Sequence, residues 1–269
     1  MDATADFAGK LALVTGAGDG IGAMLARGFA SWGMRVCVQD IRAEAANAVA
    51  NAIGNGAFPL VFDVSDRDAT MAAAVELNEK QEVISLLWCN AGAGLGSSLL
   101  SGKPTTIEWG FGVNVLGVIW TAQAFAPLMV NQDGPRHVGF TASSASLRTP
   151  RQSMPLYPVT KHAGFAVADA LAGELEAQGI ASTILFPGLL NTKIWNGARA
   201  RPDRFGGPRL ADSALSARWD AAKDPELMWP HIAHTVLGGG GYLACETEDG
   251  LAASIHNRSE VLIHKIIEI

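Results

Sequence analysis

A doubly wound α/β fold, with a parallel sheet between two layers of helices, is predicted by three features of the sequence. Short apolar runs alternate with longer helical patterns six times before Pro187. A glycine-rich turn follows the first apolar run, and neither an internal repeat nor a low-complexity linker divides the 269 residues. Alternating strands and helices form parallel sheets whose two faces are covered. We therefore expect a single domain with three layers, α/β/α.

The expected elements follow one another in a regular order. The strands are predicted at residues 10–14, 35–39, 57–62, 83–88, 137–142 and 180–186. The helices are predicted at about 21–33, 42–53, 66–80, 105–131 and 155–178. In the first helix Ile21, Leu25 and Phe29 recur every four residues, which is typical of one buried helical face. Asp66 is the expected N-cap of the third helix.

The regular alternation ends after Pro187. Residues from about 192 to 230 are rich in Arg, Pro, Gly and Trp and predict a substrate-binding loop-and-helix insertion. A C-terminal strand plus helix over about 242–267, with the strand at 242–245, is expected to close the single domain over 1–269. The glycine run Gly238–Gly241 suggests no function.

Composition argues against several classes of protein. The net charge is −6 and no long basic run is present, which argues against a nucleic-acid-binding protein. Cys37, Cys89 and Cys245 are far apart and in no metal-ligand spacing, so we expect reduced cysteines, no metal and a cytoplasmic protein. Charged residues make up only 17% of the chain, which suggests that another subunit, a ligand or a membrane covers much of the surface.

An uncharged stretch from Phe111 to Gln132 is long enough to raise the question of a membrane span. The stretch contains Asn114, Gln123 and Pro127, and no basic cluster flanks it. A helix buried between subunits is the better interpretation, and we expect no membrane partner.

The glycine-rich turn, Thr15-Gly-Ala-Gly-Asp-Gly-Ile-Gly22, lies directly between the first predicted strand and the first predicted helix. Glycines there permit a tight turn and let a pyrophosphate approach the backbone N–H groups at a helix N-terminus. The position of the pattern between a strand and a helix indicates a dinucleotide-binding site. The expected cofactor-binding residues of this turn are Gly16, Gly18, Asp19, Gly20, Ile21 and Gly22.

Asp40, at the end of the second predicted strand, bears on the choice between NAD and NADP. A carboxylate there accepts hydrogen bonds from both hydroxyls of the adenosine ribose and repels a 2′-phosphate. Asp19 favours NAD for the same electrostatic reason, whereas Arg42 could turn toward a phosphate. NAD is therefore the expected cofactor, and NADP is the alternative. Asp63 and Val64, after the third strand, are expected beside the adenine.

Seven pieces of the chain resemble the classical short-chain dehydrogenase/reductase family, in the family's order and at its spacings. They extend to about residue 192 and are Thr15–Gly22, Asp63-Val64, Asn90-Ala91-Gly92, Asn114-Val115, Ser144, Tyr157-Pro-Val-Thr-Lys161, and Pro187-Gly188 with Thr192. One departure is Cys89, which replaces the first asparagine of the family's motif. The resemblance implies a Rossmann-type fold and NAD-dependent interconversion of a secondary alcohol and a ketone.

Hydride transfer from an alcohol requires a group that takes the hydroxyl proton near neutral pH. Tyr157 has an ordinary pKa of about 10, and Lys161 follows one helical turn later on the same face. An ammonium about 4 Å away favours the phenolate by roughly 4 kcal/mol at an effective dielectric constant of ~20. That would bring the Tyr157 pKa close to ~7 before desolvation raises it again. Pro158 places Tyr157 in the first turn of its helix, near the positive end of the dipole.

The resemblance also implies roles for residues around this pair. Ser144 precedes Tyr157 by 13 residues and is the expected hydrogen-bond partner of the substrate oxygen. Ser143 and Ser146 are competing candidates, and Ser143 is expected to support the loop. Asn114 is expected to kink its helix and to hold an ordered water that leads to Lys161. The expected catalytic residues are therefore Asn114, Ser144, Tyr157 and Lys161.

Further cofactor contacts are implied by the same resemblance. Asn90, Ala91 and Gly92 are expected to steady the sheet near the cofactor. Pro187, Gly188 and Thr192 are expected to contact the nicotinamide carboxamide and orient the ring. Tyr157 and Lys161 also belong to the expected cofactor-binding set.

The substrate pocket is expected to form from residues 93–103, residues 145–155 and the segment after Thr192. Its apolar candidates are Leu95, Leu147, Met154, Leu189, Leu190, Ile194 and Trp195. The arginines that could bind a carboxylate, or simply face solvent, are Arg148, Arg151, Arg199, Arg201 and Arg204. We expect a hydrophobic secondary alcohol or ketone, possible classes being aryl and alicyclic compounds.

The family packs the helices expected at 105–131 and 155–178 across a dimer axis. Small residues that permit close contact on the second helix are Ala163, Gly164, Ala166, Ala168, Ala170, Ala172 and Gly173. We expect a homotetramer or a homodimer. The expected function is that of an NAD-dependent alcohol dehydrogenase or ketone reductase. An NADP-dependent carbonyl reductase and a non-catalytic NAD-binding regulator are the alternatives.

Overall fold

The computed structural model describes residues 3–130, 133–148, 154–211, 216–245, 250–253 and 255–256. These residues form a seven-stranded sheet with the order β3-β2-β1-β4-β5-β6-β7, in which every neighbouring pair is parallel. The strands are β1 (Leu11–Val14), β2 (Arg35–Asp40), β3 (Phe58–Val61), β4 (Ile84–Cys89), β5 (His137–Thr141), β6 (Ala181–Pro187) and β7 (Gly240–Cys245). The predicted doubly wound sheet is confirmed.

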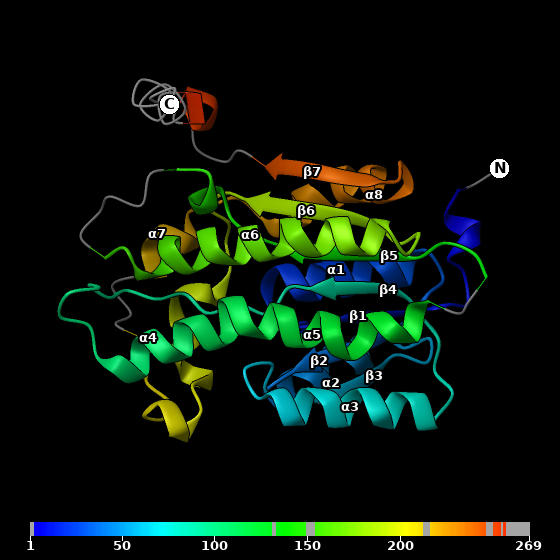
Figure 1. Cartoon of the computed structure of the whole chain (residues 1–269), viewed down its shortest axis with the longest axis horizontal. Coiled ribbons are helices and arrows are strands. Elements are labelled where there is room, and N and C mark those ends of the chain that lie inside the picture. Colours follow the sequence, from blue (N-terminus) through cyan, green and yellow to red (C-terminus); the bar gives the residue numbers. More distant parts are fainter. Residues whose placement is uncertain are drawn as a thin grey trace, which may run out of the picture.

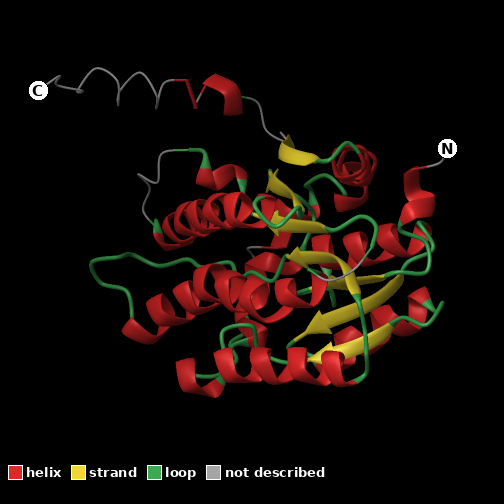
Figure 2. Ribbon diagram, turned by 45° about the vertical axis from the view of Figure 1, so that its right-hand side comes forward, coloured by secondary structure: helices red, strands yellow, loops and turns green. Residues whose placement is uncertain are grey.

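Helices cover both faces of the sheet, as Figures 1 and 2 show. One layer contains α1 (Gly20–Ser31), α2 (Ala43–Ile53) and α8 (Trp229–Leu237). The other layer contains α3 (Arg67–Glu79), α5 (Gly117–Phe125) and α6 (Leu156–Glu176). Each layer buries its own apolar cluster against the sheet, whose strands are apolar on both faces. The predicted three-layer arrangement is therefore confirmed.

The strand order reverses between β1 and β4. From β1 the chain proceeds outward through β2 to β3, and it then returns to β4 and proceeds through β5, β6 and β7 in the opposite direction. The connections at such a reversal diverge above the carboxyl ends of the strands and leave a crevice, which is where open α/β sheets bind ligands. The fold thus determines where a functional site is to be sought.

Asp66 caps α3 as predicted, because its Oδ1 accepts a 3.0 Å hydrogen bond from the Ala69 N–H. The long helix predicted over 105–131 is present but changes pitch. α4 (Pro104–Phe111) continues into one π-helical turn, η2 (Gly112–Leu116), and then into α5 and the 3-10 turn η3 (Ala126–Met129). By length and composition the combined helix could cross a membrane, and 56% of its most apolar window is buried inside the domain.

The segment after Thr192 contains the insertion predicted at 192–230. Its described parts are η5 (Lys193–Ala200), η6 (Asp203–Phe205), α7 (Ser216–Asp220) and η8 (Pro225–Met228). η8 continues directly into α8, a helix that the sequence analysis does not predict.

α8 packs against α1 on one face of the sheet. A Cβ on Gly28 of α1 would lie 2.3 Å from the Trp229 ring, so the absence of a side chain at Gly28 admits the indole. Ile232 and Val236 are buried on the same helix. Their spacing from Trp229 is helical, but Pro230 and the Pro- and Gly-rich surroundings obscure this signal in the sequence.

The glycine run before β7 has a structural role that the sequence does not reveal. Gly239 and Gly240 have φ angles of +97° and +98°, a left-handed conformation that glycine adopts without strain. A Cβ on Gly240 would lie 2.0 Å from the Ser182 carbonyl oxygen, so the glycine lets β7 pair closely with β6. The run therefore forms the turn that brings α8 to the edge of the sheet.

β7 is also bound to α6. The Tyr242 hydroxyl donates a hydrogen bond to Asp169, and the Tyr242 ring stacks on Phe186 of β6. The strand predicted at 242–245 is thus confirmed, with an earlier start at Gly240. Residues 251–253 and 255–256 are helical, and the rest of the helix predicted at 247–267 lies outside the described residues.

Candidate active site

A cleft of about 750 Å³ opens at the carboxyl ends of the strands, where the strand order reverses. Its volume lies within the range of small-molecule and cofactor sites. The expected site residues that line it are Gly16, Asp19, Gly20, Ile21, Gly22, Asp40, Asp63, Val64, Asn90, Ala91, Gly92, Ser144, Tyr157, Lys161, Pro187, Gly188 and Thr192, with Leu95, Met154, Leu189, Leu190, Ile194 and Trp195. Gly18, Asn114 and Leu147 are not in its wall.

The glycine-rich turn is held from behind by β2. The Gln39 side chain accepts a 3.1 Å hydrogen bond from Gly16 N, and its backbone carbonyl accepts one of 2.7 Å from Ala17 N. Gly18 N donates to Asp40 Oδ2 at 3.1 Å, and a Cβ on Gly18 would lie only 2.6 Å from that oxygen. Gly18 therefore supports the turn without forming the cleft wall. The sequence analysis misses the role of Gln39, which no motif marks.

Asp40 is buried at the end of β2, where it was expected to face an adenosine ribose. Its Oδ1 accepts a 2.9 Å bond from Arg42 N, and the Arg42 Nε lies 3.3 Å from the same oxygen. The carboxylate is therefore fixed by backbone donors on both sides. Arg42 adds a positive charge beside this carboxylate. Arg42 is the residue for which the sequence also allowed a contact with the 2′-phosphate of NADP.

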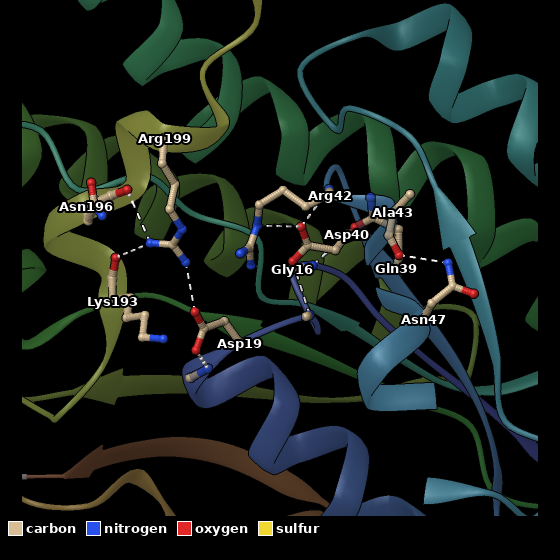
Figure 3. Close-up of polar contacts among 12 residues, drawn as sticks. Gly16, Asp19, Gln39, Asp40, Arg42, Ala43, Asn47, Lys193, Asn196 and Arg199 are labelled. Carbon is tan, nitrogen blue, oxygen red and sulfur yellow. Dashed lines mark hydrogen bonds and ion pairs between the residues drawn. The ribbon is translucent and has the colours of Figure 1, made fainter. Parts of the chain in front are cut away.

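Two arginines of the insertion form ion pairs with aspartates that line the cleft. Arg199 Nη2 lies 2.8 Å from Asp19 Oδ2, as Figure 3 shows. Arg204 Nη2 lies 2.6 Å from Asp63 Oδ2. These ion pairs connect η5 and η6 to the loops after β1 and β3, through contacts between residues far apart in the sequence.

The other candidate arginines have separate environments. Arg201 is buried, donates to the hydroxyls of Thr105 and Thr106, and lies over the Trp109 ring, so it is a structural residue. Arg148 lines the cleft. Arg151 lies outside the described residues. Among the residues that the structure describes, no group of three or more His, Cys, Asp or Glu is placed to hold a metal ion.

Hydrogen bonds through Asn90 and Thr141 connect the glycine turn to α6. Asn90 Nδ2 donates to the carbonyls of Thr15 and Gly16 at 3.0 and 3.2 Å, and Asn90 Oδ1 accepts from the Thr141 hydroxyl at 3.1 Å. The Thr141 carbonyl in turn accepts a 3.0 Å bond from Lys161 Nζ. This chain of hydrogen bonds fixes the ends of β1, β4 and β5 relative to α6, which matches the steadying role expected of Asn90.

Tyr157 and Lys161 lie in the first two turns of α6, as expected from Pro158. Burial lowers the pKa of Lys161 to about 8, because the interior disfavours its charge. Burial also raises the pKa of Tyr157 above its ordinary value, and a hydrogen bond from Ser143 opposes part of that rise. Desolvation of the phenolate therefore opposes the lowering of the Tyr157 pKa that the Lys161 charge is expected to cause.

The serine that bonds Tyr157 is Ser143, one residue before the predicted Ser144. Ser143 is buried and also accepts a 3.1 Å hydrogen bond from Ala145 N, whereas Ser144 opens the short 3-10 turn η4 (Ser144–Ser146). Ser146 donates to the Lys161 carbonyl at 2.9 Å. Both Ser143 and Ser144 line the cleft, and the hydrogen bond to Tyr157 comes from Ser143.

Asn114 lies in the π-helical turn, so the predicted kink is present. Its Oδ1 accepts from Ala93 N at 2.8 Å, and its Nδ2 donates to Ala93 O at 3.0 Å and to Thr160 at 2.9 Å. The amide thus joins the loop after β4 to α6. A small cavity of about 10 Å³, lined by Asn114, Lys161 and Cys89 among others, lies behind it and is about the size of one water.

Several of the apolar residues predicted for a substrate pocket line the cleft. Leu95, Met154, Leu189 and Trp195 line it, together with Trp109, Val113 and Trp219, which were not predicted. Leu147 instead packs against the core cluster beneath the sheet, so its expected place in the pocket is wrong. Thr192 places its methyl carbon beside Gly20, 3.1 Å from where a Cβ would lie, and so packs the start of the insertion onto the glycine turn.

The groups that line the cleft fit a nicotinamide dinucleotide. A glycine turn at the start of α1, a fixed carboxylate at the end of β2 and a cleft of sufficient volume occur in one continuous site. The fold and the site thus define a dinucleotide-binding oxidoreductase.

Comparisons with known proteins agree with this class. The family model "short chain dehydrogenase" matches residues 10–203. The chain is 31% identical to estradiol 17-beta-dehydrogenase 11 of Mus musculus over 86% of this chain and 73% of that protein. A structure of a short chain dehydrogenase/reductase from Burkholderia phymatum in complex with NAD is similar with a TM-score of 0.86 and 27% identity, over 98% of both chains. The chain belongs to the short-chain dehydrogenase/reductase family.

One relative is much longer than this chain. The "Probable oxidoreductase EphD" of Mycobacterium tuberculosis is 32% identical over 78% of this chain, but the match covers only 40% of EphD. The likeness to EphD therefore concerns one part of that protein.

Proposed function

We propose that the protein is an NAD-dependent dehydrogenase or reductase that interconverts an apolar secondary alcohol and its ketone, with Tyr157 as the acid and base. The observation that carries the proposal is the placement of Tyr157, bonded to Ser143 and one helical turn from the buried Lys161, between the glycine turn and an apolar pocket. A group that moves a proton and a hydroxyl that holds the substrate oxygen are what alcohol–ketone chemistry requires beside a hydride carrier.

Each side chain has a definite part in this chemistry. When bound, the nicotinamide supplies the acceptor or donor of hydride. Tyr157 exchanges a proton with the substrate oxygen, and its raised pKa keeps that proton in place at neutral pH for reduction of a carbonyl. Ser143 donates a hydrogen bond to the same oxygen. Lys161, held by the Thr141 carbonyl, supports the phenolate during alcohol oxidation by its positive charge.

The preference for NAD is supported by Asp40 and Asp19. The buried Asp40 carboxylate, fixed by Gly18 N and Arg42 N, repels a 2′-phosphate and accepts from ribose hydroxyls. The ion pair between Arg42 and Asp40 supports NADP as the second candidate, because Arg42 could rotate toward a phosphate. Titration with NADH and NADPH distinguishes the two, and tighter binding of NADPH would reject NAD.

The apolar lining supports a bulky substrate. Leu95, Trp109 and Trp195 line the cleft, and Tyr157 packs against the apolar cluster that contains Leu95 and Trp109. The relative named for estradiol, an alicyclic alcohol, is consistent with such a substrate. A screen of aryl, alicyclic, steroidal and sugar alcohols by NADH absorbance tests the class. We further place the enzyme in the cytoplasm as a homotetramer or homodimer, without a membrane or nucleic-acid partner.

Replacement of Tyr157 by phenylalanine tests the mechanism. We expect Tyr157→Phe to lower kcat by about 10³-fold and to leave NADH binding unchanged, because the variant loses the proton donor and retains the ring. The matched control is Tyr242→Phe, the other tyrosine of the chain, which should retain activity. Full activity of Tyr157→Phe would reject the mechanism. NADH binding by the wild type without turnover in the whole screen would instead favour a non-catalytic regulator.

A further inference from the structure

Arg199 occupies a fixed position over the start of the glycine turn. Its Nη1 donates to the carbonyls of Lys193 and Asn196 at 3.0 and 3.2 Å, and its Nη2 donates to Asp19 Oδ2 at 2.8 Å. Figure 3 shows that these contacts bring the guanidinium from η5 to the tip of α1. The side chain is only 20% exposed and lines the cleft. The guanidinium is therefore held by three bonds at the cofactor end of the site.

The Asp19 carboxylate would repel a diphosphate bound at the N-terminus of α1, and the positive charge of Arg199 offsets this repulsion. Asp19 is the N-cap of α1, and its Oδ1 accepts from Gly20 N at 2.8 Å. A dinucleotide places its diphosphate at this helix N-terminus, where the backbone N–H groups and the helix dipole attract an anion. A carboxylate at the same terminus repels that anion. A positive charge 2.8 Å from the carboxylate compensates for the repulsion.

The position of Arg199 also suits direct contact with the anion. Arg199 lines the same cleft as Asp19, Asp40 and Arg42. The charges of these three residues are close enough to act on its guanidinium. Its Nη2 carries two hydrogens, and the described residues account for one of them through Asp19. The planar guanidinium is well suited to a phosphate oxygen, and the two carbonyl bonds reduce the entropy lost on binding.

We propose that Arg199 is a cofactor-binding residue that contacts the diphosphate of the dinucleotide from the side opposite the glycine turn. The proposal rests on the dinucleotide-binding function given above and adds a residue of the insertion to the cofactor site. It also gives the insertion a second role, because the segment expected to hold substrate then contributes to cofactor affinity. Asp19 orients Arg199 for this contact.

The test compares ligands that contain or lack the diphosphate. NADH, ADP-ribose and adenosine are titrated into the wild type, Arg199→Gln and Arg199→Lys by calorimetry. We expect Arg199→Gln to weaken NADH and ADP-ribose binding about tenfold or more, because a charge-assisted hydrogen bond is lost. Adenosine binding should be unchanged, which also shows that the variant is folded. Arg199→Lys should recover part of the affinity.

A matched control and a double variant make the test decisive. Arg209→Gln removes one positive charge from an exposed position of the same insertion and should bind NADH like the wild type. In the Asp19→Asn background, Arg199→Gln should still weaken ADP-ribose binding about tenfold. Recovery of wild-type affinity in the double variant would mean that Arg199 only neutralises the charge of Asp19. That result would reject a direct contact between Arg199 and the diphosphate. An equal loss for adenosine and ADP-ribose would also reject it. Failure of the wild type to bind NADH would instead reject the proposed function.

Discussion

Ser143 and Ser144 are adjacent at the end of β5, yet their side chains have different environments. Ser143 is buried and bonds Tyr157, whereas Ser144 is half-buried in the first position of η4. A count of residues back from Tyr157 cannot decide between neighbours, because loops differ in length by single residues. The hydrogen bond from Ser143 to Tyr157 supports the proposal that Ser143 holds the substrate oxygen.

Alanine variants of Ser143 and Ser144 should differ in their effect on activity. We expect Ser143→Ala to lower kcat about 10²-fold, because a donor to the reacting oxygen is lost. Ser144→Ala is the matched control and should stay within about threefold of the wild type, since its hydroxyl has no part in the proposed chemistry. Steady-state kinetics on the substrate identified by the alcohol screen measure both. A larger loss in Ser144→Ala would restore the assignment made from spacing.

Within the elements, β5 carries a buried histidine whose titration affects stability. His137 bonds the Thr183 hydroxyl of β6 at 2.9 Å, and burial lowers its pKa from 6.5 to about 4. Between pH 6.5 and 4 the unfolded chain therefore binds a proton that the folded chain does not. The linkage relation makes the free energy of unfolding fall as pH falls through this window, and the full contribution is present above pH 6.5.

The prediction concerns the pH dependence of unfolding. From pH 7 to pH 5 the wild type should lose about 2 kcal/mol more than His137→Asn, which has no imidazole to titrate. Urea unfolding at both pH values measures the difference. His231→Asn, at an exposed position of α8, should lose as much as the wild type. Equal losses in the wild type and His137→Asn would contradict the assignment.

The elements also show what could be predicted from sequence. The strands and the glycine turn depend on local periodicity and on spacing within one strand–turn–helix unit, and these were predicted correctly. The pairs Arg199–Asp19 and Arg204–Asp63 join residues 180 and 141 positions apart, so no local pattern contains them. α8 was missed because its apolar spacing is short and Pro230 interrupts the pattern.

The whole molecule presents one helical face of small residues to solvent. Ala166, Ala170 and Gly173 are exposed along α6, and Leu116, the last residue of the π turn η2, is 41% exposed. Small side chains let two helices approach closely, which supports the proposed homo-oligomer. The low proportion of charged residues, 17%, is consistent with a surface that another copy covers.

An arginine on this face tests the assembly. We expect the wild type to sediment as two or four copies of the 28.1 kDa chain, and Ala170→Arg to dissociate toward the monomer. The cause would be a long charged side chain buried between helices. Ala72→Arg, on the exposed face of α3, is the matched control and should keep the wild-type mass. An unchanged mass for Ala170→Arg would exclude this face from the interface.

The bond between Tyr242 and Asp169 has a mechanical consequence. It fastens the middle of the helix that carries Tyr157 to the edge strand β7, and the stacking of Tyr242 on Phe186 resists sliding of that strand. A force applied to the chain beyond residue 245, through an attached domain or an immobilising surface, would therefore be transmitted along β7 into α6. A fused partner attached there would load the edge strand and this helix together.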